Sequence, residues 1–118
     1  MTHDEQHALE KLLADVAGVS VYEEGSWYYH GTVYYNNRQE PSDICWKPLS
    51  DANQMELIQD ALICDGFAIK VEWDRDLAKV VLSQFSEDHL PRFFQANHKD
   101  WRMAFALAIK AMHESTDG

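Results

Sequence analysis

His3 and His7 are the first candidates for metal chemistry in this sequence. They stand four residues apart in MTHDEQHALEKLL, and two imidazoles at that spacing on one helix can share a transition-metal ion. A usual site needs three or four ligands, however, and the start of a helix frays easily. We therefore predict no metal site here and no cofactor.

The other chemically active residues favour a non-catalytic protein. Cys45 and Cys64 lie 19 residues apart and lack the Cys-x-x-Cys arrangement of zinc knuckles and redox motifs. The neighbouring acids Glu23 and Glu24 could divide acid and base roles, but adjacent acids in polar loops are normally solvated. The sequence contains no Gly-x-Ser-x-Gly elbow and no phosphate-cradling glycine loop. We predict that the chain is not an enzyme.

Aromatic side chains crowd the stretch from Trp27 to Tyr35 and are better suited to protein recognition. Because a strand sends alternate side chains to opposite faces, some of them must face outward. We expect Trp27 and Tyr29 to fill the core, and an outward set of tyrosines could form a contact surface, since Tyr and Trp are enriched at interface hot spots. Trp46, just before Pro48, either packs over the following helix, which we favour, or joins that surface.

Charge is distributed unevenly along the chain. Twenty acidic and ten basic side chains give a formal net charge of −10 and a pI near 4.8. Residues 1–24 carry a net charge of −5 and residues 43–76 carry another −5. Such a chain gains little from neutralising phosphates, which argues against direct nucleic-acid binding. The acids can serve solubility alone, or they can face a basic partner, including by mimicry of a nucleic-acid backbone.

Length and composition predict one domain over residues 1–118 with its own core, because 46% of the residues are hydrophobic. The N-terminus shows no basic stretch followed by an apolar core, and no apolar run approaches the roughly 18–20 residues of a membrane span. We expect a cytoplasmic protein without membrane contact. Cys45 and Cys64 fit that compartment as free thiols.

The first half of the chain predicts a helix and a β-rich tract. Apolar residues at helical spacing indicate a helix capped by Thr2 or Asp4 and ended by Gly18. One or two strands follow up to residue 35, with candidate turns at residues 25–26 and 30–31. Residues 36–42 then resemble a polar loop that ends in Pro41.

The second half predicts a helix, a hairpin and a final helix. Ser50 or Asp51 caps a helix with one apolar face, and Gly66 ends it. Alternation then predicts a strand over residues 67–73, a turn at 74–76 and a return strand over 77–85. A loop containing Ser-Glu-Asp and Pro91 leads to a long helix over residues 100–114. We predict an α+β fold, with an antiparallel sheet of three to four strands and about three helices in a helix–sheet–helix sandwich.

A family resemblance adds to this interpretation. The run ICWKPLSDANQMELIQDALICDGFAIKVEW, with EEGSWYYHGTVYY before it and WRMAFALAIKAMHE after it, resembles the small phage and prophage proteins of the phage ABA sandwich domain family. The matching residues are Trp46, Pro48, Leu49, Ser50, Asp51, Gly66, Phe67 and the run from Ala104 to Ala111. The resemblance covers most of the chain. It implies an antiparallel sheet between helices and a viral or prophage origin, and with that origin a place in the host cell cytosol. It implies no chemistry.

Two functional hypotheses follow. The favoured one is a non-enzymatic phage or prophage accessory protein that binds a host or phage protein through an acidic and aromatic surface, and that could inhibit a host defence process. The alternative is a self-associating structural protein, a homodimer with no host target. The candidate binding residues are Tyr28, Tyr34, Tyr35, Trp46, Glu23, Glu24, Asp51, Glu56 and Asp60.

Overall fold

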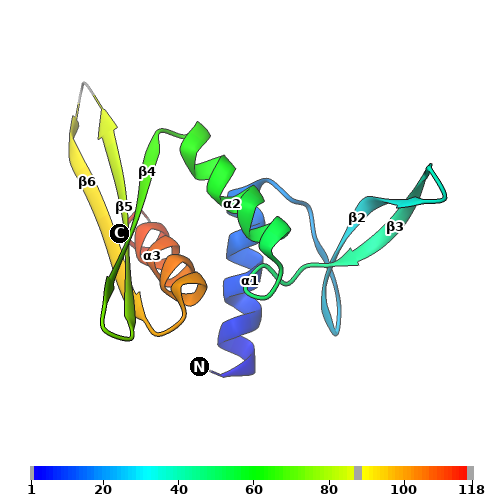
Figure 1. Cartoon of the computed structure of the whole chain (residues 1–118), viewed down its shortest axis with the longest axis horizontal. Coiled ribbons are helices and arrows are strands. Elements are labelled where there is room, and N and C mark those ends of the chain that lie inside the picture. Colours follow the sequence, from blue (N-terminus) through cyan, green and yellow to red (C-terminus); the bar gives the residue numbers. More distant parts are fainter. Residues whose placement is uncertain (1, 87–88, 117–118) are drawn as a thin grey trace.

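The computed structural model describes residues 2–86 and 89–116, and this part of the chain forms three helices and six strands (Figure 1). In chain order they are α1 (His3–Ala17), β1 (Tyr22–Glu24), β2 (Ser26–Tyr35), β3 (Arg38–Cys45), α2 (Ala52–Cys64), β4 (Phe67–Asp74), β5 (Leu77–Ser86), β6 (His89–His98) and α3 (Trp101–Thr116). The predicted α+β class and the antiparallel strand pairing are confirmed.

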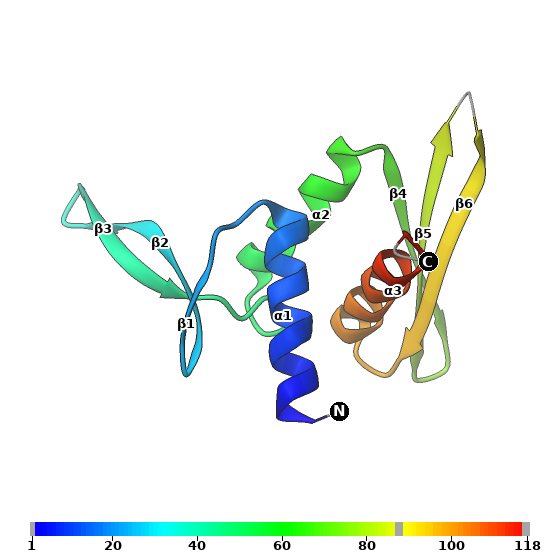
Figure 2. The same cartoon turned by 180° about the vertical axis from the view of Figure 1, so that it is seen from behind.

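The strands divide between two antiparallel sheets instead of forming one. Sheet A has the order β1-β2-β3, and sheet B has the order β4-β5-β6. In both views α1 and α2 stand between sheet B and the β2–β3 hairpin, which projects away from them (Figures 1 and 2). The radius of gyration is 15.7 Å, whereas a compact domain of this length has about 13.5 Å. The projecting hairpin accounts for this elongated shape.

The main core lies between the three helices and one face of sheet B. Alternate residues of β5, namely Ala78, Val80 and Leu82, are fully buried, as expected for a strand with one face against helices. Phe105 and Ile109 of α3, four residues apart on one helical face, are buried with them. The same core cluster includes Leu9, Leu13, Ala14, Met55, Ile58, Leu62 and Phe67.

The predicted helix boundaries are confirmed. The Thr2 hydroxyl caps α1 by accepting a hydrogen bond from the Glu5 amide at 3.2 Å. The Asp51 carboxylate caps α2 by accepting from the amides of residues 53 and 54. Gly66 follows α2 with a φ of +89°, the left-handed conformation expected at this end.

The prediction of a polar loop over residues 36–42 is wrong, because most of it belongs to β3. Asn36 and Asn37 form a two-residue turn with φ values of +49° and +64°, a conformation that asparagine tolerates well. Beyond the turn, Arg38 pairs with Tyr35 and the ladder continues to Cys45. The sequence conceals this strand because its side chains are mostly polar and exposed. The candidate turn at residues 30–31 lies inside β2.

The loop predicted around Pro91 is also wrong, because Pro91 lies in β6. Within the described part of the chain this strand pairs with β5 alone, and an edge strand of this kind tolerates a residue without an N–H. Phe94 and Ala96 lie opposite Leu82 and Val80 and extend the buried face of sheet B. Residues 87 and 88 of the predicted loop lie outside the described residues.

Candidate protein-binding surface

The β2–β3 hairpin, which we call the arm, is the part of the molecule least supported by the rest. Every residue from 32 to 41 is exposed. A two-stranded hairpin is marginally stable by itself in water, so the arm needs a firm attachment at its base.

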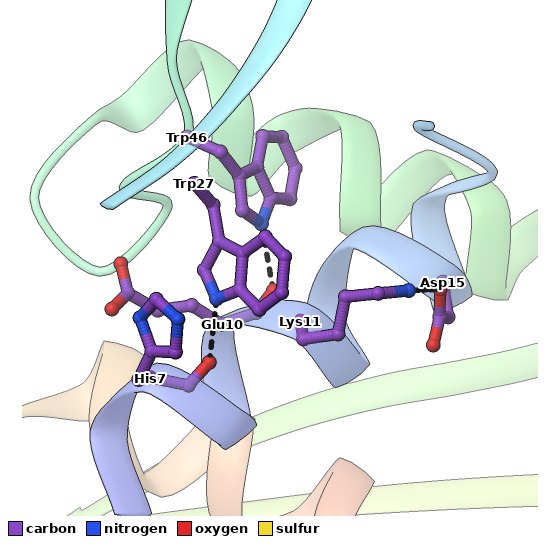
Figure 3. Close-up of polar contacts among 6 residues, drawn as sticks. All are labelled: His7, Glu10, Lys11, Asp15, Trp27 and Trp46. Atoms are coloured by element: carbon purple, nitrogen blue, oxygen red, sulfur yellow. Dashed lines mark hydrogen bonds and ion pairs between the residues drawn. The ribbon is translucent and has the colours of Figure 1, made fainter. Parts of the chain in front are cut away.

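Two indoles attach the arm to α1 (Figure 3). The Trp27 Nε1 donates a hydrogen bond to the His7 carbonyl oxygen, and the Trp46 Nε1 donates one to the Glu10 carbonyl oxygen, both at 2.8 Å. The Trp46 backbone amide also donates to the Trp27 carbonyl at 2.7 Å. A carbonyl oxygen has two lone pairs, so these bonds are compatible with the helical hydrogen bonds of α1.

Ring contacts complete this attachment. The His7 imidazole stacks on Trp27 with ring centres 4.5 Å apart, and Tyr29 meets Trp46 edge-on at 5.9 Å. Trp27 and Tyr29 pack against the core, as predicted. Trp46 is only 1% exposed, so its place among the candidate surface residues is corrected: it packs in the core, because its indole N–H finds a partner there.

The strand register gathers a set of side chains on the opposite face of sheet A from Trp27 and Tyr29. We call this set, Tyr22, Tyr28, His30, Tyr34 and Asp43, the arm face. Tyr22 stacks on Tyr28 with ring centres 6.0 Å apart and on His30 at 5.2 Å. The His30 Nδ1 lies 2.7 Å from the Asp43 Oδ1 across the β2–β3 pair. The arm face therefore combines aromatic rings with a carboxylate in direct contact.

Tyr22 is the most electrostatically constrained member of the arm face. Its half-buried position raises the pKa of its phenol above the ordinary value, and a hydrogen bond and negative charge from Asp43 raise it further. The charge of Glu24 acts in the same direction. Each of these influences disfavours the phenolate, so Tyr22 presents a neutral hydroxyl beside the Asp43 side chain. That pair suits a basic side chain of a partner better than an acidic one.

The two tyrosines at the tip of the arm are exposed on opposite faces. Tyr34, 74% exposed, belongs to the arm face, where its hydroxyl accepts a hydrogen bond from the Gln39 Nε2 at 3.1 Å. Tyr35, 65% exposed, lies on the other face opposite Arg38. Glu23 and Glu24, at the base of the arm, also lie on opposite faces of the sheet. Glu24 shares the side of the arm face, whereas the Glu23 carboxylate approaches the His7 Nε2 at 3.1 Å.

The candidate acids of α2 lie away from the arm face. Asp51 is engaged in capping the helix. Glu56 and Asp60 line a cleft of about 340 Å³ between α2 and the start of α3, together with Trp101 and Arg102. The structure thus separates the predicted surface into an arm, a cleft, a helix cap and a buried tryptophan.

Sequence reasoning missed Tyr22, His30 and Asp43 of the arm face. Tyr22 and His30 were visible as neighbours of the predicted aromatic stretch, but Asp43 joins them only through the pairing of β2 with β3. Recognising the Asn-Asn turn would have revealed that pairing. Within residues 2–86 and 89–116, no three His, Cys, Asp or Glu side chains gather as a metal site requires.

Compared with known proteins, the chain matches no family model, no curated protein and no solved structure. Among the described residues, no helix has the length and apolar character needed to span a membrane.

Proposed function

We propose that this chain is a non-enzymatic accessory protein of a phage or prophage that binds a protein partner with its arm face. The observation that carries the proposal is the firmly attached arm whose aromatic face remains exposed. Two indole hydrogen bonds fix its base, yet Tyr34 is 74% exposed. Preorganised aromatic side chains lose little conformational entropy on binding, which favours recognition.

Charge supports a basic partner. Residues 1–66, which include α1, the arm and α2, hold twelve acids and three bases, whereas residues 67–116 hold seven of each. An acidic half of this kind attracts basic surfaces over several ångströms and speeds encounter. On the arm face, Asp43 and the tyrosine rings then offer an arginine or lysine both a carboxylate and aromatic faces.

The binding experiment uses the two neighbouring tip tyrosines as a matched pair. Immobilised wild-type protein, Tyr34→Ala and Tyr35→Ala are exposed to a bacterial lysate at low and high salt. We expect the wild type and Tyr35→Ala to bind the same lysate protein. Tyr34→Ala should bind at least tenfold less of it, because of the two tyrosines only Tyr34 lies on the arm face. High salt should weaken the retention, as for any acidic–basic interface. Equal retention by both variants would contradict the proposal.

The specific role that we propose for this binding is inhibition of a host defence process. The resemblance to phage and prophage proteins and the acidic half of the molecule support this role. Bacteria that carry a defence system and express the wild type should then be infected more efficiently than bacteria that express Tyr34→Ala. If both strains resist infection equally across defence systems, the inhibitory role is wrong, although Tyr34-dependent binding would still stand.

A further inference from the structure

The arm has two free strand edges, and their unpaired groups can be assigned from the register. The Trp27 carbonyl accepts from Trp46 on the β3 side, so the odd-numbered residues of β2 direct their backbone groups toward β3. The even-numbered residues direct theirs toward the other edge. There β1 covers β2 only from Ser26 to Tyr28. The N–H and C=O groups of His30, Thr32 and Tyr34 therefore point to an open edge.

Only one of the two edges carries the usual protection against pairing. On β3, Pro41 lies opposite Thr32, where its missing N–H would have pointed to the free edge, and Arg38, Glu40 and Asp43 add charge. By contrast, β2 has no Asp, Glu, Lys or Arg among its ten residues, SWYYHGTVYY. An uncharged open edge is unexpected in a protein with a net charge of −10.

We propose that two copies of this chain pair edge to edge through His30–Tyr34 of β2, antiparallel and around a twofold axis at Thr32. The result is a continuous four-stranded sheet in the order β3-β2-β2-β3. Thr32 lies opposite Thr32 of the second copy, and His30 lies opposite Tyr34. A twofold interface of this kind needs one self-complementary surface, which a strand segment centred on Thr32 provides.

A second copy fits this edge because self-pairing places no like charges opposite one another. A strand from an acidic or basic partner would gain no electrostatic attraction from the uncharged β2. Two copies of this chain, by contrast, pair their neutral strands and keep their acidic side chains apart. This dimer goes beyond the proposed function. The dimer uses the backbone edge of β2, and the arm faces of both copies remain free on the same side of the sheet. An experiment can therefore disprove dimerisation without disproving partner binding, and the reverse.

The test places charged residues at Thr32, on the twofold axis. Thr32→Glu and Thr32→Lys each bring two like charges together, so each variant alone should dimerise at least tenfold more weakly than the wild type. An equimolar mixture should recover dimers, because glutamate then faces lysine. Sedimentation equilibrium distinguishes 13.6 kDa from twice that mass. Gln95→Glu and Gln95→Lys are matched controls, since Gln95 is exposed on β6, an edge strand of sheet B outside the arm, and both should dimerise as the wild type does.

Two further measurements separate the dimer from the binding of a basic partner. Salt should strengthen dimerisation, because it screens repulsion between two copies of charge −10, whereas it should weaken binding to a basic protein. Amide exchange at Thr32 and Tyr34 should slow as protein concentration rises, while Val33, which faces β3, should not change. A wild type that stays monomeric up to about 1 mM, or a dimer insensitive to Thr32→Glu, would overturn the inference and leave Tyr34-dependent binding untouched.

Discussion

At the scale of single residues, the two tryptophans at the base of the arm serve stability. Trp46 is buried and its indole N–H is bonded to α1. We expect Trp46→Phe to lower the free energy of unfolding by about 2–3 kcal/mol, through the lost hydrogen bond and the cavity left by the smaller ring. Tyr35→Phe, on the exposed tip, should change it by less than about 0.5 kcal/mol. Urea denaturation followed by circular dichroism measures both, and equal effects would show that Trp46 is not a core residue.

Glu10 carries a pH dependence that can be isolated by one substitution. Desolvation raises the pKa of its half-buried carboxyl, and the charges of His7 and His3 partly oppose that rise. A raised pKa in the folded state means that the contribution of Glu10 to stability is complete below the ordinary value of 4.5 and is lost as pH rises through the raised pKa.

Glu10→Gln stays neutral and should therefore stabilise the protein near neutral pH, by about 1–2 °C in the melting temperature because the site is only half-buried. The difference should vanish below pH 4.5, where the carboxyl is protonated in both states. The Trp46 hydrogen bond uses the Glu10 backbone carbonyl and is unaffected. Melting curves across this range provide the measurement, and a variant less stable at neutral pH would contradict the assigned cause.

At the scale of elements, periodic segments were predictable and polar strands were not. The apolar stripe of α2 predicted the helix correctly because burial imposes it. The alternation of β4 also predicted the strand, but the expected half-burial fails beyond Ile69, because Val71 and Trp73 are 40% and 57% exposed. The strand β3 has no such pattern, since both of its faces are exposed over most of its length. The prediction of the binding residues was limited for the same reason. Alternation showed that some tyrosines must face outward. Which acids lie beside them, however, depends on strand pairing between residues distant in sequence.

Gly31 links the sequence of the arm to its packing. A Cβ at this position would lie 2.3 Å from the Cδ1 of Ile44, which covers the glycine from the neighbouring strand. We expect Gly31→Ala to destabilise the protein by about 1 kcal/mol, although alanine in an extended strand is otherwise favoured over glycine. In an Ile44→Val background the Cδ1 is absent, so the same substitution should cost less, although the Ile44 Cγ1 and Tyr29 Cε2 positions still lie 3.2 and 3.3 Å from the added Cβ. Denaturant unfolding of the wild type, the two single variants and the double variant gives the coupling free energy between the two positions. Equal effects of Gly31→Ala in both backgrounds would exclude this contact as the cause.

The tip of the arm should be dispensable for folding. Removing residues 32–35 and 38–41 would let Asn36 and Asn37 join Gly31 to Ser42, a pair with the same hydrogen-bonding orientation as Tyr35 and Arg38. Because residues 32–41 are exposed, we expect the melting temperature to stay within about 2 °C of the wild type. Differential scanning calorimetry measures this directly. A large loss of stability would show that the tip supports the rest of the fold.

At the scale of the whole molecule, charge and shape divide the chain in the same way. The acidic half, residues 1–66, contains α1, α2 and the arm, and the neutral half contains sheet B and α3. Repulsion within the acidic half should therefore cost stability at low ionic strength. Glu56 is a suitable probe because Asp60, four residues further along α2, is a like charge on the same helical face and lines the same cleft.

We expect Glu56→Gln to stabilise the protein at low ionic strength by about 0.3–0.5 kcal/mol and to have little effect at about 0.5 M salt, where the repulsion is screened. Glu72→Gln in the neutral half is the matched control. The Glu72 carboxylate lies 2.8 Å from the Lys70 Nζ, which lowers its pKa, so neutralising it removes a favourable pair and should destabilise the protein slightly. Urea denaturation at the two salt concentrations measures both variants. If both substitutions shift stability in the same direction at low salt, uneven charge is not what limits the stability of the acidic half.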